Sequence, residues 1–438
     1  MAVVPQFSSE TRCHPLADSG RGTIRIGLLG LGQVGSALAR LILDRPRTGD
    51  VRTEITTALV RDPVRPRLAR GVAETCDPET VFDTQPTVIV EALGGLEPAR
   101  TLVLEAIARG IPVVTANKSL LAHHGDELLE AASVAGVPLR YEASVIAGVP
   151  FLGTFARRPY ASALSAFSGI LNGTTNFILS QMADGGRDYR SALSDAQRRG
   201  FVEPDPSKDV GGVDAVEKLT ILIRQFAGLR VDPGAIETTG IERLTSDDLA
   251  GARGLGGTLK PVVHAEGIAR AGGTSPIVAF AGPAFVRDEH PLARVHQAGN
   301  GLCLQAVSGS QMCFTGPGAG PDATAITMLD DVLEAASPSA FPLPPAARPG
   351  LVGAPTTGWL LRVTSESALP PAVDIADLLG AQGVWAERTT PRDTRDGRET
   401  QSCLVYPCDR PRIERAAAAL AAATRSNTRV FRALEALA

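Results

Sequence analysis

The chain of 438 residues is predicted to be an α/β protein with a mostly parallel sheet in its first third. From Thr23 to Pro150, short apolar runs alternate with stretches in which apolar residues recur at helical spacing. Such alternation predicts βαβ units, whose strands pair in parallel. After Pro150, longer helices mix with strands, which indicates an α+β domain. A proline-rich stretch at 337–351 then indicates a stiff linker before a third segment.

The individual elements follow from the local patterns. TIRIGLLG, TEITTALV, TVIVEAL, IPVVTA and VPLRYEA predict the strands of the first domain, and PARTLVLEAIARG and DELLEAASVAG predict helices between them. The third segment has the order strand, helix, strand, strand, helix, which suits a small ferredoxin-like module. We therefore expect a flexible tail at 1–22, a parallel-sheet domain at 23–150, an α+β domain at 151–315, the linker at 337–351 and the module at 352–438.

Composition excludes several classes of protein. A hydrophobic content of 44% and a charged content of 21% are ordinary for a globular protein. The net charge of −4 gives no general attraction to nucleic acid or anionic membranes. No apolar run approaches the roughly 20 residues that span a bilayer, and the first residues lack the features of a secretion signal. We expect a cytoplasmic protein with a small-molecule substrate and neither nucleic acid nor membrane as partner.

The six cysteines form no C-x-x-C pair and no zinc pattern with histidine. Reduced thiols are therefore expected throughout the chain.

A glycine-rich turn follows the first strand directly. In GLGQVG, Gly30 permits a tight turn, Gly32 lets the backbone approach a diphosphate, and Gly35 lets the next helix pack closely. The diphosphate would rest on the helix N-terminus, where free N–H groups and the helix dipole favour negative charge. The position between a strand and a helix favours a Rossmann-type dinucleotide site over a purely structural turn. The expected cofactor contacts are Gly30, Leu31, Gly32, Gln33, Val34 and Gly35.

The end of the second strand bears on the choice of dinucleotide. An acidic residue there would bind the ribose hydroxyls of NAD, whereas an arginine suits the 2′-phosphate of NADP. The chain has Arg61 at this place, followed at once by Asp62. NADP is the expected cofactor, with NAD as the alternative.

Lysine is scarce in this chain, and its positions are informative. Only four occur, Lys118, Lys208, Lys218 and Lys260, and two of them lie in EPDPSKDVGGVDAVEK at 203–218. Asp214 and Lys218 are four residues apart in a predicted helix, so their side chains point the same way. They form either a surface ion pair or part of an active site, since a lysine can stabilise an oxygen that receives a hydride and give it a proton. For Lys208, an exposed loop is the simpler interpretation.

Five later motifs, taken with GLGQVG in this order, resemble the homoserine dehydrogenase family over roughly residues 23–335. They are VTANKSLLA, YEASVIAGVP, ILNGTTNFIL, GFVEPDPSKDVGGVDAVEK and GPGAGPDATA. The resemblance implies reduction of L-aspartate 4-semialdehyde to L-homoserine with NAD(P)H, on the way to threonine, methionine and isoleucine. It also implies that residues 316–336 return to the cofactor domain and that the chain forms a homodimer through its α+β domain.

The same resemblance assigns roles to single residues. Lys218 becomes the proton donor, and Asp214 lies beside the substrate as part of the catalytic pair. Lys118 lies near both nicotinamide and substrate, where it would either assist the proton transfer or hold the substrate carboxylate. At both lysines, an ammonium that can lose its proton is expected to be useful. The remaining implied contacts are Gly200, Glu203, Asp209 and Asp214 for the substrate, with Glu203 reaching its amino group, and Lys118 and Gly318 for the cofactor.

YEASVIAGVP resembles the monovalent cation site of that family. The implied ligands of a sodium ion are Glu142 and the backbone carbonyls of Val145, Ala147 and Val149, and oxygen ligands suit such a hard cation. The chain departs from the family at Ile146, where Gly or Ala is expected, so the path of this loop is open to difference.

Two further departures keep alternatives open. The late motif has PDATA where PTA is usual, which bears on the cofactor contact near Gly318. The C-terminal module resembles an ACT domain, but its SESALPPAVD loop lacks the usual glycine, so a role in packing or dimerisation competes with effector binding. For the whole chain, the alternatives are an oxidoreductase recruited to another amino-acid aldehyde or ketone and a non-enzymatic nucleotide or amino-acid sensor.

Overall fold

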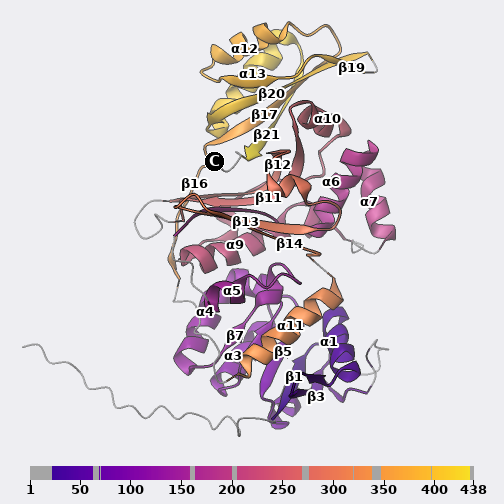
Figure 1. Cartoon of the computed structure of the whole chain (residues 1–438), viewed down its shortest axis with the longest axis vertical. Helices are drawn as coiled ribbons and strands as arrows, with labels where there is room; N and C mark the ends of the chain where they lie inside the picture. Colours follow the sequence, from indigo (N-terminus) through magenta and orange to yellow (C-terminus); the bar gives the residue numbers. More distant parts are fainter. Residues whose placement is uncertain are drawn as a thin grey trace, which may run out of the picture.

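The computed structural model describes residues 22–434, and it shows three parts that follow one another along the longest axis of the molecule (Figure 1). The residues between these limits that it leaves out are 63–68, 70, 158–162, 200–204, 269–275, 319, 338–346 and 396. Almost all of the expected tail and most of the expected linker therefore lie outside the described residues. In the described part of the chain, no helix is long and apolar enough to span a membrane.

The first part is built on a seven-stranded sheet. Its strands are β1 (Thr23–Leu29), β2 (Arg47–Thr48), β3 (Val51–Leu59), β4 (Glu74–Thr75), β5 (Val88–Glu91), β6 (Val113–Thr115) and β7 (Leu139–Arg140). All pair in parallel except β2, which runs antiparallel to β3. Without β2, the order of the strands is β4-β3-β1-β5-β6-β7, which is the Rossmann order. The predicted parallel sheet is confirmed.

Helices cover this sheet, and one of them comes from much later in the chain. The helices of this part are α1 (Gln33–Asp44), α2 (Pro78–Asp83), α3 (Ala99–Ala108), α4 (Lys118–Ala135), the short η1 (Glu142–Ser144) and α11 (Pro321–Ala335). Helix α11 packs against α1, and its buried side chains join the apolar core beside β1 and β5 (Figure 1). Residues 321–335 thus lie against the first domain.

A twelve-stranded sheet runs through the other two parts. In the middle part its strands are β8 (Leu164–Ile170), β10 (Glu237–Thr238), β11 (Gly257–Glu266), β12 (Ile277–Arg287), β13 (Asn300–Ala306), β14 (Gln311–Gly316) and β16 (Val352–Gly353). The helices there are α5 (Leu152–Arg157), α6 (Gly173–Gly185), α7 (Tyr189–Arg198), α8 (Ser207–Val210), α9 (Val213–Ala227), η2 (Pro233–Ala235), α10 (Ser246–Gly254) and η4 (Pro291–Arg294). Helix α9 packs between this sheet and α4 of the first part. A separate short pair joins β9 (Leu229–Arg230) to β15 (Arg348–Pro349).

The C-terminal part has the strand order of a ferredoxin-like module. Its elements are β17 (Thr357–Ser365), α12 (Ala372–Gly380), β18 (Ala386–Thr389), β19 (Asp393–Arg395), β20 (Arg398–Cys408), α13 (Arg410–Thr424) and β21 (Asn427–Leu434). The sequence analysis missed β21, the strand that completes the βαββαβ unit. This strand pairs antiparallel with β17 and parallel with β12, so the module continues the sheet of the middle part.

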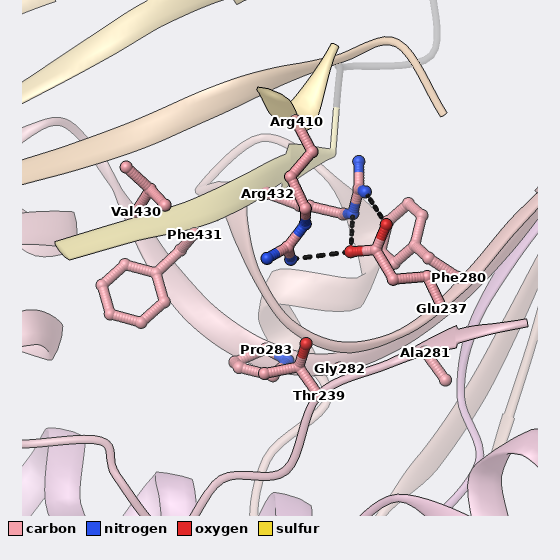
Figure 2. A pocket seen from close by; sticks show the side chains of 10 residues that line it. All are labelled: Glu237, Thr239, Phe280, Ala281, Gly282, Pro283, Arg410, Val430, Phe431 and Arg432. Carbon is pink, nitrogen blue, oxygen red and sulfur yellow. Dashed lines mark hydrogen bonds and ion pairs between the residues drawn. The ribbon is translucent and has the colours of Figure 1, made fainter. Parts of the chain in front are cut away.

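A small polar cavity marks one place where the module meets the middle part (Figure 2). Glu237 of β10 accepts hydrogen bonds from Arg432 of β21 and lies 2.7 Å from Nη2 of Arg410. The guanidinium of Arg432 also stacks over Phe280 and Trp359. The cavity has a volume of about 30 Å³, which holds little more than a water molecule, so this site joins the two parts and leaves no room for a substrate.

A second ion network ties the module to α10. Asp248 is fully buried, and its Oδ2 accepts a hydrogen bond of 2.5 Å from Nη1 of Arg429. The Nε of Arg362 lies 2.7 Å from Oδ1 of Asp248 in an ion pair whose angle is not that of a hydrogen bond. Asp248 also completes the capping box of α10 with Thr245. One carboxylate therefore serves both the helix and the junction.

The expectation that all cysteines are reduced thiols is wrong for one pair. Cys303 of β13 and Cys313 of β14 face each other directly in the antiparallel register, with Cα atoms 4.2 Å apart, and form a disulfide. Their ten-residue separation spans a hairpin, so only the pairing of the strands reveals their contact. Cys76, Cys403 and Cys408 are free thiols.

The junction can be tested at Asp248. Asp248→Ala should lower the free energy of unfolding by about 3–5 kcal/mol, because it removes the buried carboxylate that compensates the charge of the buried Arg362. Asp247→Ala is the matched control: Asp247 also lies near Arg362, but its side chain is 52% exposed, so its loss should cost less than about 1 kcal/mol. Urea unfolding followed by circular dichroism measures both. Equal, small losses in the two variants would contradict this account of the junction.

Candidate active site

The turn between β1 and α1 has the geometry that a dinucleotide needs. Gly30 has a φ of 103°, in the region that favours glycine, and a Cβ there would meet the backbone of Ala92. A Cβ on Gly35 would collide with the carbonyl oxygen of Gly30. Gly32, by contrast, precedes the first residue of α1, and a Cβ there would meet no described atom within 4 Å. Residues 30–35 therefore fit a diphosphate, which this helix end would attract.

Arg61 lies two residues beyond the end of β3 and is exposed. The place agrees with the expected end of the second parallel strand. Asp62 beside it is also exposed, and both lie next to the carboxyl edge of the sheet. Arg61 is thus available to a ligand at this edge.

A buried carboxylate organises the carboxyl ends of β5 and β6, and the sequence analysis missed it. Oε1 of Glu91 accepts hydrogen bonds from the backbone N–H groups of Leu93 (2.8 Å) and Gly94 (3.2 Å). Its Oε2 accepts from the hydroxyl of Thr115 at 2.5 Å. Burial raises the pKa of Glu91 despite these donors. The residue holds the loops after β5 and β6, the first of which borders Gly30. Only its position at the end of an apolar strand could have indicated it.

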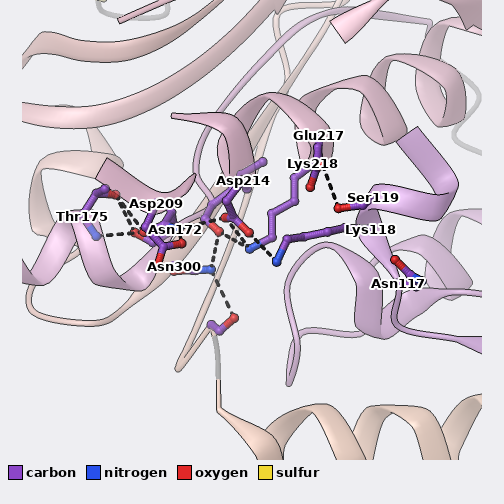
Figure 3. A network of polar contacts seen from close by, with 12 residues as sticks. Asn117, Lys118, Ser119, Asn172, Thr175, Asp209, Asp214, Glu217, Lys218 and Asn300 are labelled. Atoms are coloured by element: carbon purple, nitrogen blue, oxygen red, sulfur yellow. Dashed lines mark hydrogen bonds and ion pairs between the residues drawn. The ribbon is translucent and has the colours of Figure 1, made fainter. Parts of the chain in front are cut away.

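The three predicted catalytic side chains meet in one ion network (Figure 3). Lys118 is the first residue of α4, and its Nζ lies 2.7 Å from Oδ1 of Asp214. Lys218 lies one turn after Asp214 in α9, and its Nζ is 3.1 Å from Oδ2 of the same carboxylate. One carboxylate thus binds an ammonium from each of two parts of the molecule.

The burial of this network shows that it is not a surface ion pair. The side chains of Asp214 and Lys218 are 5% and 10% exposed, so the i,i+4 pair is shielded from water, whereas the side chain of Lys118 is 40% exposed. Burial alone would raise the pKa of Asp214, but the two ammonium groups and a hydrogen bond from Asn172 hold it well below its usual range. The carboxylate therefore stays charged.

The expectation of an ammonium that loses its proton is wrong for Lys118. Burial alone would lower its pKa, but the pKa is raised, because the negative charge of Asp214, with those of Glu217 and Asp209 farther away, stabilises the ammonium. Lys118 consequently stays protonated near neutral pH, which suits it to holding an anion or a developing oxyanion.

Asn172 connects a second carboxylate to the network. Its Nδ2 donates to Oδ2 of Asp214 at 2.9 Å and to Oδ1 of Asp209 at 2.7 Å. Burial and the like charge of Asp214 raise the pKa of Asp209. Asn172 lies in the ILNGTTN motif and also caps α6, so the helix start and the carboxylate pair are set by one side chain.

The carbonyl oxygen of Leu171 is the second partner of the lysine in α9. It accepts hydrogen bonds from Nζ of Lys218 at 2.6 Å and from Nδ2 of Asn300 at 3.1 Å. Asn300 is fully buried at the start of β13, and its Nδ2 also donates to the carbonyl of Gly318 at 3.3 Å. The sequence analysis missed Asn300, which connects Lys218 to the glycine-rich segment expected at the cofactor (Figure 3).

The loop with the expected sodium ligands packs against α11: the N–H groups of Glu142 and Gly148 donate to Asp331 and Thr327 of that helix. Ala147 pairs with Gly318 in an isolated antiparallel bridge, and Ile146 is completely buried in the apolar core. The carboxylate of Glu142 accepts hydrogen bonds of 2.6–2.9 Å from the backbone N–H groups of residues 151–153 at the start of α5. Within the described ranges, no group of three or more His, Cys, Asp or Glu side chains is arranged to hold a metal ion.

Two predicted substrate contacts and the two remaining lysines complete the comparison with the sequence. Gly200 and Glu203 lie outside the described residues. Lys208 is exposed, as expected, although it lies in the short helix α8 and not in a loop. The fourth lysine, Lys260, is buried and donates to the carbonyl of Val295 at 2.7 Å.

Two family models match this chain, and together they cover most of it. The homoserine dehydrogenase model matches residues 150–333, and the model of the homoserine dehydrogenase NAD-binding domain matches residues 30–142. The matched ranges contain the glycine turn, the ion network and Asn300.

Individual proteins support the same assignment. The homoserine dehydrogenase of Synechocystis is 37% identical over 317 residues, which are 71% of this chain and 73% of that protein. The homoserine dehydrogenase of Corynebacterium glutamicum is 33% identical over 404 residues, with coverage of 87% and 89%. The crystal structure of a homoserine dehydrogenase from Thiobacillus denitrificans superposes with a TM-score of 0.84 at 29% identity, covering 96% of this chain and 100% of that one. The chain belongs to the homoserine dehydrogenase family.

Proposed function

We propose that this chain catalyses the reversible transfer of hydride between NADP(H) and the pair L-aspartate 4-semialdehyde and L-homoserine, in the biosynthesis of threonine, methionine and isoleucine. The observation that carries the proposal is the buried network of Lys118, Asp214 and Lys218 between the dinucleotide domain and the middle part. When bound, the nicotinamide ring supplies or accepts the hydride. The residues of the chain hold the substrate and move the proton.

Lys218 is the proposed proton donor. As a hydride reaches the aldehyde carbon, negative charge develops on the oxygen, and an ammonium beside it stabilises that charge and gives it a proton. Asp214 and the carbonyl of Leu171 leave one of the three N–H donors of Lys218 for this oxygen. In the reverse direction, the neutral amine accepts the proton of the alcohol.

The other polar residues are proposed to orient the substrate. Lys118 stays charged and reaches the same carboxylate from the cofactor side, so it suits the developing oxyanion or the substrate carboxylate. Asp209 and Asp214 present carboxylates to an ammonium, as Glu203 does in the resemblance. Gly200 would lie against the substrate with its backbone.

NADP is proposed over NAD because Arg61 stands exposed at the carboxyl edge, next to β3. A guanidinium forms charge-assisted hydrogen bonds with a 2′-phosphate, which NAD lacks. Gly318 is proposed as the contact from the returning segment.

A sodium ion is proposed at the carbonyls of Val145, Ala147 and Val149 with Glu142. Because the side chain of Glu142 already accepts three backbone N–H groups, backbone oxygen atoms would supply most of the ligands. We further propose that the chain forms a homodimer in the cytoplasm. The predicted domain limits and the ACT-like character of the C-terminal module also remain part of this proposal.

The activity itself is tested by following NADPH absorbance with purified protein and L-aspartate 4-semialdehyde. We expect oxidation of NADPH and formation of homoserine. Turnover only with another amino-acid aldehyde or ketone would support the recruited oxidoreductase, and binding of NADPH without turnover of any of these would support the sensor.

The role of Lys218 is tested by Lys218→Arg. Arginine keeps the charge but cannot give up its proton, so kcat should fall by about 10²–10⁴-fold while the fold and NADPH binding remain. Lys208→Arg, in the same segment but exposed, is the matched control and should leave kcat unchanged. If Lys218→Arg keeps more than about a tenth of the wild-type kcat at saturating cofactor, Lys218 is not the proton donor.

The role of Arg61 is tested by Arg61→Ala. The KM for NADPH should rise by about 10- to 100-fold, since a charge-assisted contact of about 1.5–3 kcal/mol is lost, and the KM for NADH should hardly change. Arg52→Ala, at the opposite end of β3, removes an exposed arginine away from the carboxyl edge and should change neither value. Equal effects of Arg61→Ala on both cofactors would show that another residue selects NADP.

A further inference from the structure

Asn300 donates hydrogen bonds both to the carbonyl partner of Lys218 and to the glycine-rich segment. Its Nδ2 lies 3.1 Å from the carbonyl oxygen of Leu171 and 3.3 Å from that of Gly318. We infer that Asn300 is a positioning residue that places the ammonium of Lys218 in register with Gly318 on the cofactor side. The inference rests on the proposed function, because it gives Lys218 the role of proton donor.

The orientation of the Asn300 amide follows from its partners. Both neighbours of the side-chain end are carbonyl oxygens, which accept hydrogen bonds and cannot donate them. Only the NH₂ group can face them, so the amide oxygen must point elsewhere, and among the described residues it has no hydrogen-bond donor. The side chain is completely buried, so water does not compete for its hydrogen bonds.

The carbonyl of Leu171 sets the position of the ammonium. Leu171 directly follows the last residue of β8. Its carbonyl oxygen lies 2.6 Å from Nζ of Lys218, whereas the carboxylate of Asp214 lies 3.1 Å from the same nitrogen. Because Asn300 donates to the same oxygen, it restricts the movement of that carbonyl and the space around it. A shift of the Asn300 amide would therefore be passed to Lys218 through a shared acceptor (Figure 3).

Gly318 provides the connection to the cofactor side. Its φ is 79°, and a Cβ on this residue would collide with Cγ of Asn300, so the backbone and the amide are in close contact. The same residue bridges to Ala147 of the loop at 141–150. A displacement of Gly318 when the cofactor binds must therefore either move Asn300 or be resisted by it.

The chain contains a matched control in Asn176 of α6. This asparagine is also completely buried, and its Nδ2 donates to two backbone carbonyls, those of Val295 and Gly299, at 3.1 Å each. Its Oδ1 likewise has no donor among the described residues. Asn176 differs from Asn300 in its acceptors: its amide donates to Val295 and Gly299, whereas that of Asn300 donates to Leu171 and Gly318. Loss of the two side chains should thus have similar structural costs but different effects on the reaction.

The experiment compares Asn300→Ala, Asn300→Asp and Asn176→Ala in the full-length enzyme with NADPH and aspartate 4-semialdehyde. Asn300→Asp keeps the shape of the side chain while removing the N–H donors. It therefore replaces the alanine variant in the test if that variant does not fold. For both Asn300 variants we expect kcat to fall on the order of 10- to 100-fold, as misplacement of a reacting group by about 1 Å does, with a smaller change in the KM for NADPH. Asn176→Ala should keep kcat within about threefold, since it leaves the placement of Lys218 intact.

A second readout separates positioning from general destabilisation. With NADPH deuterated at the transferred position, the isotope effect on kcat should increase in the Asn300 variants, because a misplaced proton donor slows the chemical step. It should stay at the wild-type value in Asn176→Ala. Thermal unfolding should show a similar decrease in Tm for the two alanine variants.

The outcomes are distinguishable. An inactive wild type would contradict the proposed function and this inference with it. An active wild type with Asn300→Asp at wild-type kcat, or with equal losses of kcat in the Asn176 and Asn300 variants, would overturn the role of Asn300 alone.

Discussion

The buried carboxylate of Asp214 is the group on which the rest of the site depends. A charge that is 4% exposed is stable only when opposite charges and hydrogen bonds compensate for the lost water. Lys118 supplies that compensation from the dinucleotide domain and Lys218 from the middle part. The ion network therefore holds two parts of the molecule together at the place where hydride and proton transfer are proposed to occur.

Other contacts between α4 and α9 keep the network in place. The hydroxyl of Ser119 donates to Oε1 of Glu217 at 2.7 Å, and Nε of Arg224 lies 2.7 Å from Asp126. Arg224 also donates to the carbonyl of Leu121. These pairs lie along the same two helices, so the orientation of the lysines is set over several turns and not by one ion pair.

Much of the fold could be predicted because its signals are local. The alternation of apolar runs predicted the parallel sheet, and the GLGQVG turn predicted a nucleotide site, since both patterns occur within a few tens of residues. The spacing of Asp214 and Lys218 likewise predicted that they face the same way. Their catalytic roles, and those of the substrate and sodium ligands, remain predictions.

The parts that could not be predicted depend on contacts between distant residues. Asn300 meets Leu171 across 129 positions, and nothing around it in the sequence distinguishes it from a buried asparagine of a strand. Glu91 is a single charge at the end of an apolar run. The strand at 427–434 contains two arginines within a short apolar stretch, and only its pairing with β12 and β17 explains why they are accommodated.

The shared sheet makes the C-terminal module more than an appendage. Residues 284–286 of β12 have their hydrogen-bonding edge covered by β21. A chain that ended before the module would present this edge, with the buried side chains of Ala284, Phe285 and Val286 beside it, as an open template for strands of other molecules. Removing the module should thus make this protein more prone to aggregation, although the module lies far from the glycine turn.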